Sequence, residues 1–534
     1  MADAFIPSPQ LEPSPLRRWR VGLPFALCPI LTWLGFANPL LQIPLLVVLF
    51  PVLLFQQARH SRTRGQAFKR GWLMGGLTFS LCLYWVVVPV HYFGGLAWIA
   101  ALPCPLLLGA YLGLFPAAFC LGTHWASRTF SWPLLGLFAA LLWVLLEWFR
   151  GIFLTGFPWL GLAQAFSAWP ASIQTLQYIG ALGLTGVIVL CSIWLTAGYR
   201  NRSAWIGVLL ILSLTTAFGI WKLKQPLASR GTGFSALIVQ GNIDQNRKWD
   251  PAYQQETLNS YLELSRRGLQ TSEPDLVLWP ETAMPFYLQE SKELTESIRR
   301  LCQSEEIDLI TGAPGYTLLP GGGYHLHNRA YLFDRSGSIT DYYSKQHLVP
   351  FGEYVPFSRF LPFLSKLVQG VGDFAPGPRA EPLKTRNLAM GILICYEIIF
   401  EQLADRRVDM QSNVLINLSN DAWFGRTSAP RQHLHQAVLR AVEQQRFVIR
   451  ATNSGISAVI TPRGTLRARS DLFETQIIHT GELSTLNSRT VYSRYRNTGL
   501  LAGAVLFALM LGAGLLSPGL RRESTGSGDE NRNF

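Results

Sequence analysis

The sequence predicts an α-helical membrane domain followed by an α/β layered domain outside the membrane. Of 534 residues, 49% are hydrophobic and only 15% are charged, whereas soluble domains are about a quarter charged. Charged residues are scarce before about residue 222 and reach the density of a soluble protein between about 225 and 496. This uneven distribution indicates two bodies, each large enough to bury a core.

Eight apolar runs come close to the length of about 20 residues that a helix needs to cross a bilayer. They cover about 21–37, 39–56, 72–90, 94–122, 131–149, 177–198, 204–221 and 498–517. Arginines precede the first run, but no convincing cleavage site precedes the second, so we expect a retained span and not a signal peptide. The break at Asn38-Pro39 leaves open a helical hairpin or a pair of broken helices.

Loop charges predict the orientation in the bilayer. With the N-terminus in the cytoplasm, the short loops on the other side carry a single basic residue, Arg150, as the positive-inside rule requires. The cytoplasmic set is Arg17, Arg18, Arg20, Arg59, Arg62, Arg64, Lys69, Arg70, Arg128, Arg200, Arg202, Arg521, Arg522 and Arg532.

This orientation defines the expected domains. We expect a cytoplasmic N-terminus over 1–20, a seven-helix membrane domain over 21–222, a body outside the cytoplasm over 225–490, an eighth helix over 498–517 and a disordered cytoplasmic tail over 518–534. The net charge of +13 then serves orientation. No basic stripe with interleaved aromatics is present, so nucleic-acid binding is not expected.

The body alternates predicted strands and helices, which is typical of an α/β layered domain. Predicted strands cover 234–243, 275–281, 307–314, 387–397 and 413–421, and predicted helices cover 249–269, 291–306 (capped by Ser291) and 431–446. On the last helix, Arg440 and Glu443 are interpreted as a structural ion pair.

Three strand ends in this body finish on reactive residues: Glu281, Lys345 and Cys395. Ligands collect outside the carboxyl ends of strands in α/β domains. A free thiol, with a pKa near ~8.5, needs a neighbour that takes its proton or stabilises the thiolate. A glutamate can act as the base and a lysine can hold an oxyanion. The set suits acyl transfer, although the spacing does not say whether the three residues meet.

The blocks LWPET, YSKQHLVPFGEYVP, LICYE and LSNDAWFG resemble the motifs of the nitrilase superfamily, whose Glu–Lys–Cys triad works through a thioester. Seven helices before such a domain and one after it resemble the apolipoprotein N-acyltransferases of the bacterial inner membrane. The resemblance covers essentially the whole chain. It implies a nitrilase-like αββα sandwich in the periplasm and a multi-pass protein of the inner membrane.

The resemblance also implies a reaction. Cys395 would take an acyl chain from a membrane phospholipid, with Glu281 as base and with Lys345 and the Tyr396 backbone N–H holding the oxyanion. The thioester would then acylate the α-amino group of the S-diacylglyceryl-cysteine of an apolipoprotein, the final step of lipoprotein maturation. No cofactor, metal or nucleotide is expected, and a monomer suffices.

By the same resemblance, Glu353, Glu397 and Tyr396 support the triad, and Trp249, Asn328, Tyr396 and Trp423 line the substrate pocket. Simpler interpretations stay open. Glu397 could pair with an arginine, Asn328 could cap a turn, and the tryptophans could belong to the core or an interface. Lys345 could be a surface lysine, and Cys395 could fill the core or form a disulfide with Cys302.

Segment 358–375 is apolar for a loop outside the membrane. It could dip into the outer leaflet as a lid or pack on the domain. The alternative function is a membrane-tethered nitrilase-type amidohydrolase, although a tether needs one helix and not eight. A transporter would place more ionisable residues within its spans, and a catalytically dead scaffold would be expected to have lost the triad.

Overall fold

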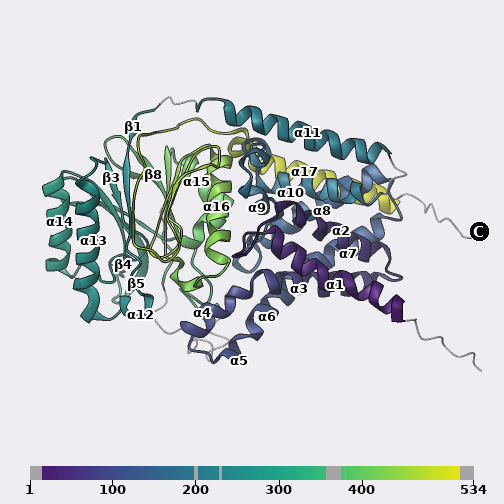
Figure 1. Ribbon diagram of the computed structural model, residues 1–534, viewed down its shortest axis with the longest axis horizontal. Coiled ribbons are helices and arrows are strands. Elements are labelled where there is room, and N and C mark those ends of the chain that lie inside the picture. Colours follow the sequence, from purple (N-terminus) through teal and green to yellow (C-terminus); the bar gives the residue numbers. More distant parts are fainter. Residues whose placement is uncertain (1–14, 198–201, 228–230, 357–373, 379, 517–534) are drawn as a thin grey trace, which may run out of the picture.

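Two six-stranded sheets form the centre of the C-terminal half (Figure 1). The computed structural model describes residues 15–197, 202–227, 231–356, 374–378 and 380–516. The first sheet has the order β13(Gln476–His479), β2(Ala236–Gln240), β3(Leu276–Leu278), β4(Asp308–Leu318), β5(Tyr324–Phe333), β6(Ile339–Ser344). The second has the order β12(Leu466–Arg469), β11(Ala458–Ile460), β10(Val448–Thr452), β9(Val414–Ser419), β8(Ala389–Ile394), β7(Leu383–Lys384). A small third sheet pairs β1(Gly233–Phe234) with β14(Leu483–Ser484).

The central strands of both sheets are buried on both faces. β2 pairs in parallel with β3, and β9 pairs in parallel with β8 and β10, and such strands need cover on each side. One face of each sheet packs against the other sheet. The opposite sides are covered by α13(Gln254–Leu269) and α14(Lys292–Glu305) on the first sheet and by α15(Glu401–Asp409) and α16(Ala429–Gln444) on the second (Figure 1). The predicted α/β layered architecture is therefore confirmed, as an αββα sandwich.

Local sequence explains two differences from the predicted elements. The helix expected from residue 249 begins at Gln254, because Pro251 starts a short 3-10 turn that the carboxylate of Asp250 caps through the N–H of Ala252, at 3.0 Å. Trp249 therefore lies between this turn and α12(Gln245–Lys248) and not on a long helix. Ser291 stands at the cap position of α14 but makes no capping hydrogen bond with its side chain.

The N-terminal half is helical, and the chain is a multi-pass membrane protein. Five helical spans are long and apolar enough to cross a bilayer, and a sixth is counted if α3 and the bent segment after it form one span with a bend of 59°. The five spans are Trp98–Ala126, which contains α5(Trp98–Ala101), α6(Pro103–Leu112) and α7(Leu114–Ala126), then α8(Trp132–Arg150), α10(Leu176–Leu195), α11(Arg202–Lys224) and α17(Val491–Leu516). The bent pair joins α3(Arg64–Cys82) to η2(Tyr84–Val86) and α4(Val87–Tyr92).

The first two predicted spans correspond to shorter apolar helices, Gly22–Gly35 and Pro44–Arg59, which lie within α1(Pro15–Gly35) and across η1(Pro44–Val48) and α2(Leu49–Arg59). They are separated at Asn38, whose side-chain oxygen accepts the N–H groups of Leu40 and Leu41, each at 2.9 Å. Because an asparagine side chain that bonds the backbone in this way competes with helix, the two helices end and restart here.

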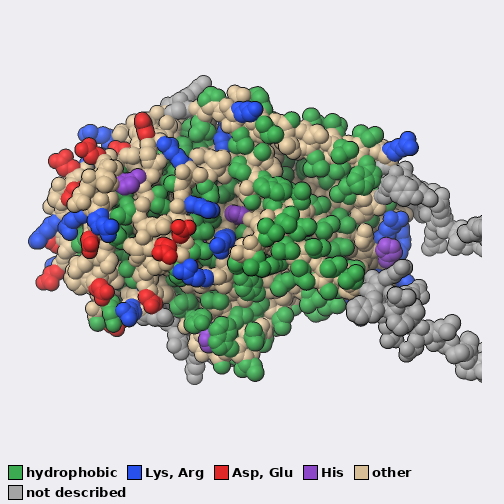
Figure 2. Space-filling model, viewed as in Figure 1, with side chains coloured by type: hydrophobic (Ala, Val, Ile, Leu, Met, Phe, Trp, Pro, Cys, Tyr) green, Lys and Arg blue, Asp and Glu red, His purple; other side chains and the backbone are tan. Residues whose placement is uncertain are grey.

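The surface of the sandwich differs in composition from the surface of the helical half. Charged side chains are spread over the sandwich, whereas hydrophobic side chains cover most of the helical half in this view (Figure 2). Exposed apolar residues on single spanning helices include Leu209, Leu210 and Leu214 of α11 and Leu501, Leu509 and Leu515 of α17. Such a belt is the surface that lipid would cover.

The sandwich is docked on the membrane helices through α16. Gln432 of this helix accepts hydrogen bonds from the indole N–H groups of Trp85 and Trp159, at 3.2 and 2.8 Å. Further along α16, Glu443 accepts the N–H of Ala181 at 2.8 Å. Glu443 also pairs with Arg440 at 2.7 Å, so the predicted structural ion pair is confirmed. Buried polar contacts of this kind fix the orientation of two packed bodies.

Candidate active site

The three predicted reactive residues follow strands of the two facing sheets. Glu281 lies in the turn after β3, Lys345 follows β6 directly, and Cys395 follows β8 directly. Their side chains are buried, with Lys345 1% and Glu281 6% exposed. Lys345 Nζ lies 3.5 Å from Glu281 Oε1, and the charges of both residues act on the pKa of Cys395. The fold therefore brings the three stretches together.

Lys345 has a second acidic partner. Its Nζ donates to Oε1 of Glu353 at 3.0 Å. Asn328, on β5, donates to Glu281 Oε1 at 2.8 Å and to Glu353 Oε1 at 3.0 Å. Asn328 thus joins two carboxylates within the site and does not cap a turn, and the interpretation of Lys345 as a surface lysine is wrong. The other oxygen of Glu353 accepts the N–H of Val349 at 2.8 Å, which holds its carboxylate in place.

The environment shifts the pKa of both Glu281 and Lys345 upward. Burial raises the pKa of Glu281, and Glu353 adds to the rise against the opposing effect of Lys345. Burial alone would lower the pKa of Lys345, but Glu353 and Glu281 outweigh it, so the ammonium stays charged. A carboxylate with a raised pKa is a stronger base, and a fixed cation is suited to hold an oxyanion.

One oxygen of Glu281 is free to take a proton. Among the described residues, Oε2 of Glu281 is buried and has no hydrogen-bond partner. Burial also raises the pKa of the Cys395 thiol, with Glu281 adding to the rise and Lys345 opposing it. The resting thiol therefore keeps its proton, and a base must remove that proton before the sulfur can attack.

Cys395 occupies a constrained position in the backbone. β8 ends at Ile394, and Cys395 begins the 3-10 helix η8(Cys395–Ile399) with a φ of +49°. A left-handed φ is unusual for a residue with a side chain, and such strain concentrates at functional sites. A core-filling cysteine needs no strained backbone. Cys395 and Cys302 are both free thiols, so the disulfide between them is absent.

Glu397 holds this turn. Its Oε2 accepts the N–H of Ile394 at 2.7 Å, and its Oε1 accepts the hydroxyl of Tyr343 at 2.7 Å. Oε1 also accepts the N–H groups of Gln346 and His347, at 2.7 and 3.1 Å. Glu397 thereby ties the segment after Lys345 to the start of η8. The alternative that Glu397 pairs with an arginine is not seen among the described residues, because the nearby arginine, Arg407, bonds the hydroxyl of Tyr343 instead.

The predicted pocket aromatics lie in different surroundings. Tyr396 donates its hydroxyl to the carbonyl of Gly156, in a loop of the helical half, at 3.2 Å. Trp423, on η9(Asp421–Phe424), packs edge to face on Phe93 of the same half, with 4.5 Å between ring centres. Both residues therefore contact the membrane domain. Trp249 is partly buried and follows Lys248 directly.

Lys248 is a site residue that the sequence did not reveal. It is 1% exposed, and its Nζ lies 3.3 Å from both the carbonyl oxygen of Glu281 and the hydroxyl of Thr282. Burial lowers the pKa of Lys248 to about 8, against the opposing effect of Glu281. Nothing in the stretch QNRKWDP separates this lysine from a solvated one.

A second group of site residues that the sequence did not reveal contacts the backbone of Cys395. His433, on α16, is fully buried, and its Nε2 lies 3.1 Å from the carbonyl oxygen of Cys395. Its Nδ1 lies 3.0 Å from Oδ1 of Asp421 and 3.1 Å from Nη2 of Arg450. Asp421 forms an ion pair with Arg450 at 2.7 Å and accepts the hydroxyl of Ser419 at 2.8 Å. Ser419 and Asp421 belong to the family motif LSNDAWFG. This motif was the feature of the sequence that pointed to these residues.

The same group fits hydrogen bonding better than metal binding. One ligand atom each of Cys395, Asp421 and His433 lies within 4.8 Å of the others. Yet Asp421 is already paired with a guanidinium, and that fixed positive charge opposes a cation at the same place.

Comparisons with known proteins agree with this architecture. Residues 236–487 match the carbon-nitrogen hydrolase family, and residues 29–194 match the apolipoprotein N-acyltransferase N-terminal domain. The chain is 35% identical to an apolipoprotein N-acyltransferase of Geobacter metallireducens, over 90% of this chain and 93% of the relative. It is 34% identical to one of Nitrosomonas europaea, over 92% and 96%. The chain therefore belongs to the apolipoprotein N-acyltransferase family of membrane-bound N-acyltransferases.

Proposed function

We propose that this enzyme moves a fatty acyl chain from a membrane phospholipid to the α-amino group of the N-terminal S-diacylglyceryl-cysteine of an apolipoprotein, through a thioester on Cys395. The observation that supports this most is Oε2 of Glu281, which has no hydrogen-bond partner among the described residues and lies in one site with a charged Lys345 and a strained nucleophile. The names of the relatives point to the acceptor, and the lipid-facing surface points to a donor within the bilayer.

In the first half-reaction, Glu281 takes the proton of the Cys395 thiol while the sulfur attacks the ester carbonyl of the phospholipid. Lys345 and the backbone N–H of Tyr396 hold the oxyanion that forms. The ester C–O bond then breaks, Glu281 returns the proton to the leaving oxygen, and a lysophospholipid departs. The acyl group remains on Cys395 as a thioester.

In the second half-reaction, the α-amine attacks the thioester carbonyl and the same groups hold the oxyanion. Glu281 takes the amine proton and passes it to the departing thiolate of Cys395 as the C–S bond breaks. The enzyme returns to its starting state and the product is an amide. A thioester lies above an amide in free energy, so the sequence of steps needs no ATP and no cofactor.

Around this centre we assign Glu353 and Glu397 to positioning and Asn328, Tyr396, Trp249 and Trp423 to the pocket. Asn328 donates to the base, and Glu353 and Glu397 hold Lys345 and the turn at Cys395. Tyr396 and Trp423 face the membrane domain, on the side from which lipid would enter. Most of the predicted lid, 358–375, lies outside the described residues.

The proposal places the enzyme in the bacterial inner membrane as a monomer with eight spans. Seven spans over 21–222 precede a periplasmic catalytic domain over 225–490, and the eighth, over 498–517, returns the chain to the cytoplasm. Residues 1–14 and 517–534 lie outside the described residues, so most of the predicted cytoplasmic N-terminus, 1–20, and all of the predicted tail, 518–534, do too. The loop charges support this orientation.

A single-turnover experiment tests the function. Purified enzyme is mixed with a phospholipid of known acyl chain and then with a diacylglyceryl peptide, and the Cys395 peptide and the lipids are analysed by mass spectrometry. We expect an acyl group on Cys395, one lysophospholipid per acyl-enzyme, and transfer to the peptide amine. An unacylated Cys395, or full turnover by Cys395→Ala, would overturn the proposal. Release of free fatty acid without amide would favour the amidohydrolase alternative.

A further inference from the structure

A two-stranded arm extends from the first sheet past the catalytic centre. The register of β3 with β4 ends at Ile310, and the register of β6 with β5 begins at Arg329. Between these positions β4 and β5 continue as a paired ribbon, residues 311–328, which we call the arm. We infer that the arm binds the polypeptide that follows the N-terminal cysteine of the apolipoprotein, and this inference rests on the proposed function.

One face of the arm continues from the catalytic centre. Side chains alternate between the two faces of a ladder, and paired residues share a face. Asn328 donates to the proposed base Glu281, so its face is the catalytic one. Tyr324 lies on this face, four residues from Asn328 along β5, which is roughly 13 Å of strand. The pairs that share the face are Pro314–Asn328, Tyr316–Leu326 and Leu318–Tyr324.

The tip of the arm is apolar and exposed. Leu318 is 72% and Tyr324 is 60% exposed. The stretch 311–328 contains no Asp, Glu, Lys or Arg, whereas charged side chains are spread over the sandwich (Figure 2). A two-stranded ribbon has no core of its own in which to bury such residues. A contiguous exposed apolar surface of this kind marks an interaction site.

The arm is held in place at Tyr316. Oε1 of Gln289 accepts the N–H of Tyr316 at 3.0 Å, and Nε2 of Gln289 donates to its carbonyl at 3.2 Å. The ring centre of Tyr316 lies 6.0 Å from that of Tyr324 and 5.7 Å from that of Tyr287. Tyr287 and Gln289 follow β3 in the same segment as Glu281. The row of tyrosines therefore connects the tip of the arm to the segment that carries the base.

The position of the arm favours a polypeptide over the membrane. The arm belongs to the first sheet, and the second sheet and α16 lie between the first sheet and the helical half (Figure 1). Stacked sheets are about 10 Å apart. The arm therefore belongs to a layer of the sandwich that is remote from the apolar belt of the helical half.

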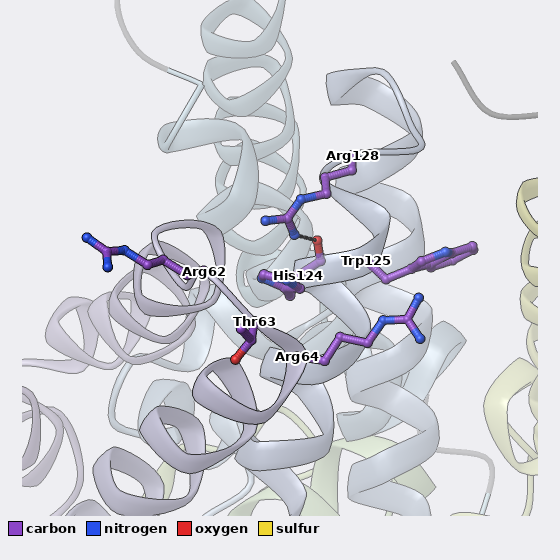
Figure 3. Close-up of a pocket in the computed structure, with 6 residues that line it drawn as sticks. All are labelled: Arg62, Thr63, Arg64, His124, Trp125 and Arg128. Carbon is purple, nitrogen blue, oxygen red and sulfur yellow. Dashed lines mark hydrogen bonds between the residues drawn. The ribbon is translucent and has the colours of Figure 1, made fainter. Parts of the chain in front are cut away.

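Basic side chains lie at the opposite end of the helical half. Trp125 packs against Gly514 near the end of α17, whereas Arg496 near the start of α17 donates to Asp405 of the sandwich at 3.1 Å. Around the hollow that Trp125 lines, three exposed arginines point away from one another (Figure 3): Arg62, Arg64 and Arg128. Separate charges of this kind suit orientation in the bilayer. They support the proposed orientation, in which the arm and the polypeptide of the acceptor lie on the same side of the membrane.

Of the two proposed substrates, the acceptor alone has a part that reaches the arm. The acyl chains of both stay in the bilayer and the phospholipid ends at its headgroup, whereas the acceptor continues as a polypeptide from the cysteine whose amine reacts. An extended chain advances roughly 3.3–3.6 Å per residue, so about four residues lead from Asn328 to Tyr324. Tyrosine and leucine offer apolar contact, and an uncharged surface does not select acceptors by charge.

A length series of acceptors tests the inference. Enzyme acylated from phospholipid is given diacylglyceryl peptides with one, four or eight residues after the cysteine, and the KM and kcat of transfer are measured. For the parent we expect KM to fall once the peptide exceeds about four residues. In Tyr324→Ser and Leu318→Ser this fall should be lost, with KM for the eight-residue acceptor raised about tenfold. The one-residue acceptor should react with the variants as with the parent.

His325→Ser is the matched control. His325 is exposed and adjacent to Tyr324, but it pairs with Thr317 and so lies on the other face of the arm. This variant should keep the dependence on peptide length that the parent shows. Formation of the Cys395 thioester from phospholipid should proceed at the parent rate in all three variants, which also shows that they are folded.

Three results would overturn the inference. One is the same dependence on peptide length in the parent and in both arm variants, and another is a loss in His325→Ser as large as in Tyr324→Ser. The third is slower thioester formation in the arm variants, because the arm would then serve the donor lipid or the chain's own segment 358–375. Transfer to the one-residue acceptor tests the proposed function separately, since an enzyme that never acylates this amine lacks that function whatever the arm binds.

Discussion

The ammonium of Lys345 lies 3.0 Å from Glu353, closer than the 3.5 Å that separates it from the proposed base Glu281. One lysine and one asparagine thus contact two carboxylates, the buried Glu281 and the partly buried Glu353. The pKa of Glu281 is raised by burial and by Glu353, and is lowered by Lys345 and Lys248. The pH dependence of acylation should therefore respond to these neighbours with opposite signs.

Replacing Glu353 by Gln should move the acid limb of the acylation profile to lower pH. The base acts when deprotonated, so the rate rises as the pH passes the pKa of Glu281. Removing the negative charge of Glu353 lowers that pKa. We also expect a maximal rate lower by roughly tenfold to a hundredfold, less than the loss of a whole oxyanion donor, about 10²–10³-fold. Single-turnover thioester formation between pH 4 and 9 measures both effects. A shift of the acid limb to higher pH would refute the assignment of Glu281 as the base influenced by Glu353.

Replacing Lys248 by Met should move the same limb to higher pH. Lys248, whose pKa is lowered to about 8 by burial, is charged over most of the acid limb and lowers the pKa of Glu281. Without it the carboxyl holds its proton to higher pH. Lys292→Met removes an exposed lysine from α14 and is the matched control. A shift of equal size in both variants would show a general charge effect and no role for Lys248.

Replacing His433 by Ala should slow acylation without weakening donor binding. Burial and then Arg450 lower the pKa of His433, so the neutral ring donates through Nε2 to the carbonyl of Cys395. Loss of this bond leaves that carbonyl unpaired, at about 1–3 kcal/mol, and frees the turn that aims the thiol.

A positioning role for His433 predicts a lower acylation rate at an unchanged half-saturating donor concentration. His433→Gln can still donate to the carbonyl and should recover part of the rate. If both variants bind donor more weakly and acylate at the parent rate when saturated, His433 does not position the nucleophile.

Replacing Glu397 by Ala should lower the free energy of unfolding by about 3 kcal/mol or more, because hydrogen bonds to a charged group contribute about 1.5–3 kcal/mol each. Its carboxylate accepts four hydrogen bonds that join two loops of the site. Glu296→Ala is the matched control, since this exposed glutamate pairs with Arg300 one turn away and with no other residue in the described part of the chain, and such pairs contribute under about 1 kcal/mol. Thermal unfolding in detergent compares the two, and similar stability losses would contradict the role given to Glu397.

The sequence revealed the ends of the buried strands more clearly than the turns that follow them. An apolar run led to the strand before Cys395, because a strand covered on both faces leaves little room for polar residues. The left-handed backbone at Cys395 left no trace in the sequence, because a non-glycine residue is held there by contacts from elsewhere, here from Glu397 and His433. Lys248 was missed because burial is decided by what packs around a side chain.

What the sequence by itself determined is the division into an apolar helical part and a layered α/β part, together with the candidate nucleophile, base and cation. These properties are written in local composition and in short blocks of residues. Only the tertiary structure decided that one lysine stands between two carboxylates and that a buried histidine contacts the backbone carbonyl of the nucleophile. Such groupings depend on distances between segments far apart in the chain, and no local pattern encodes those distances.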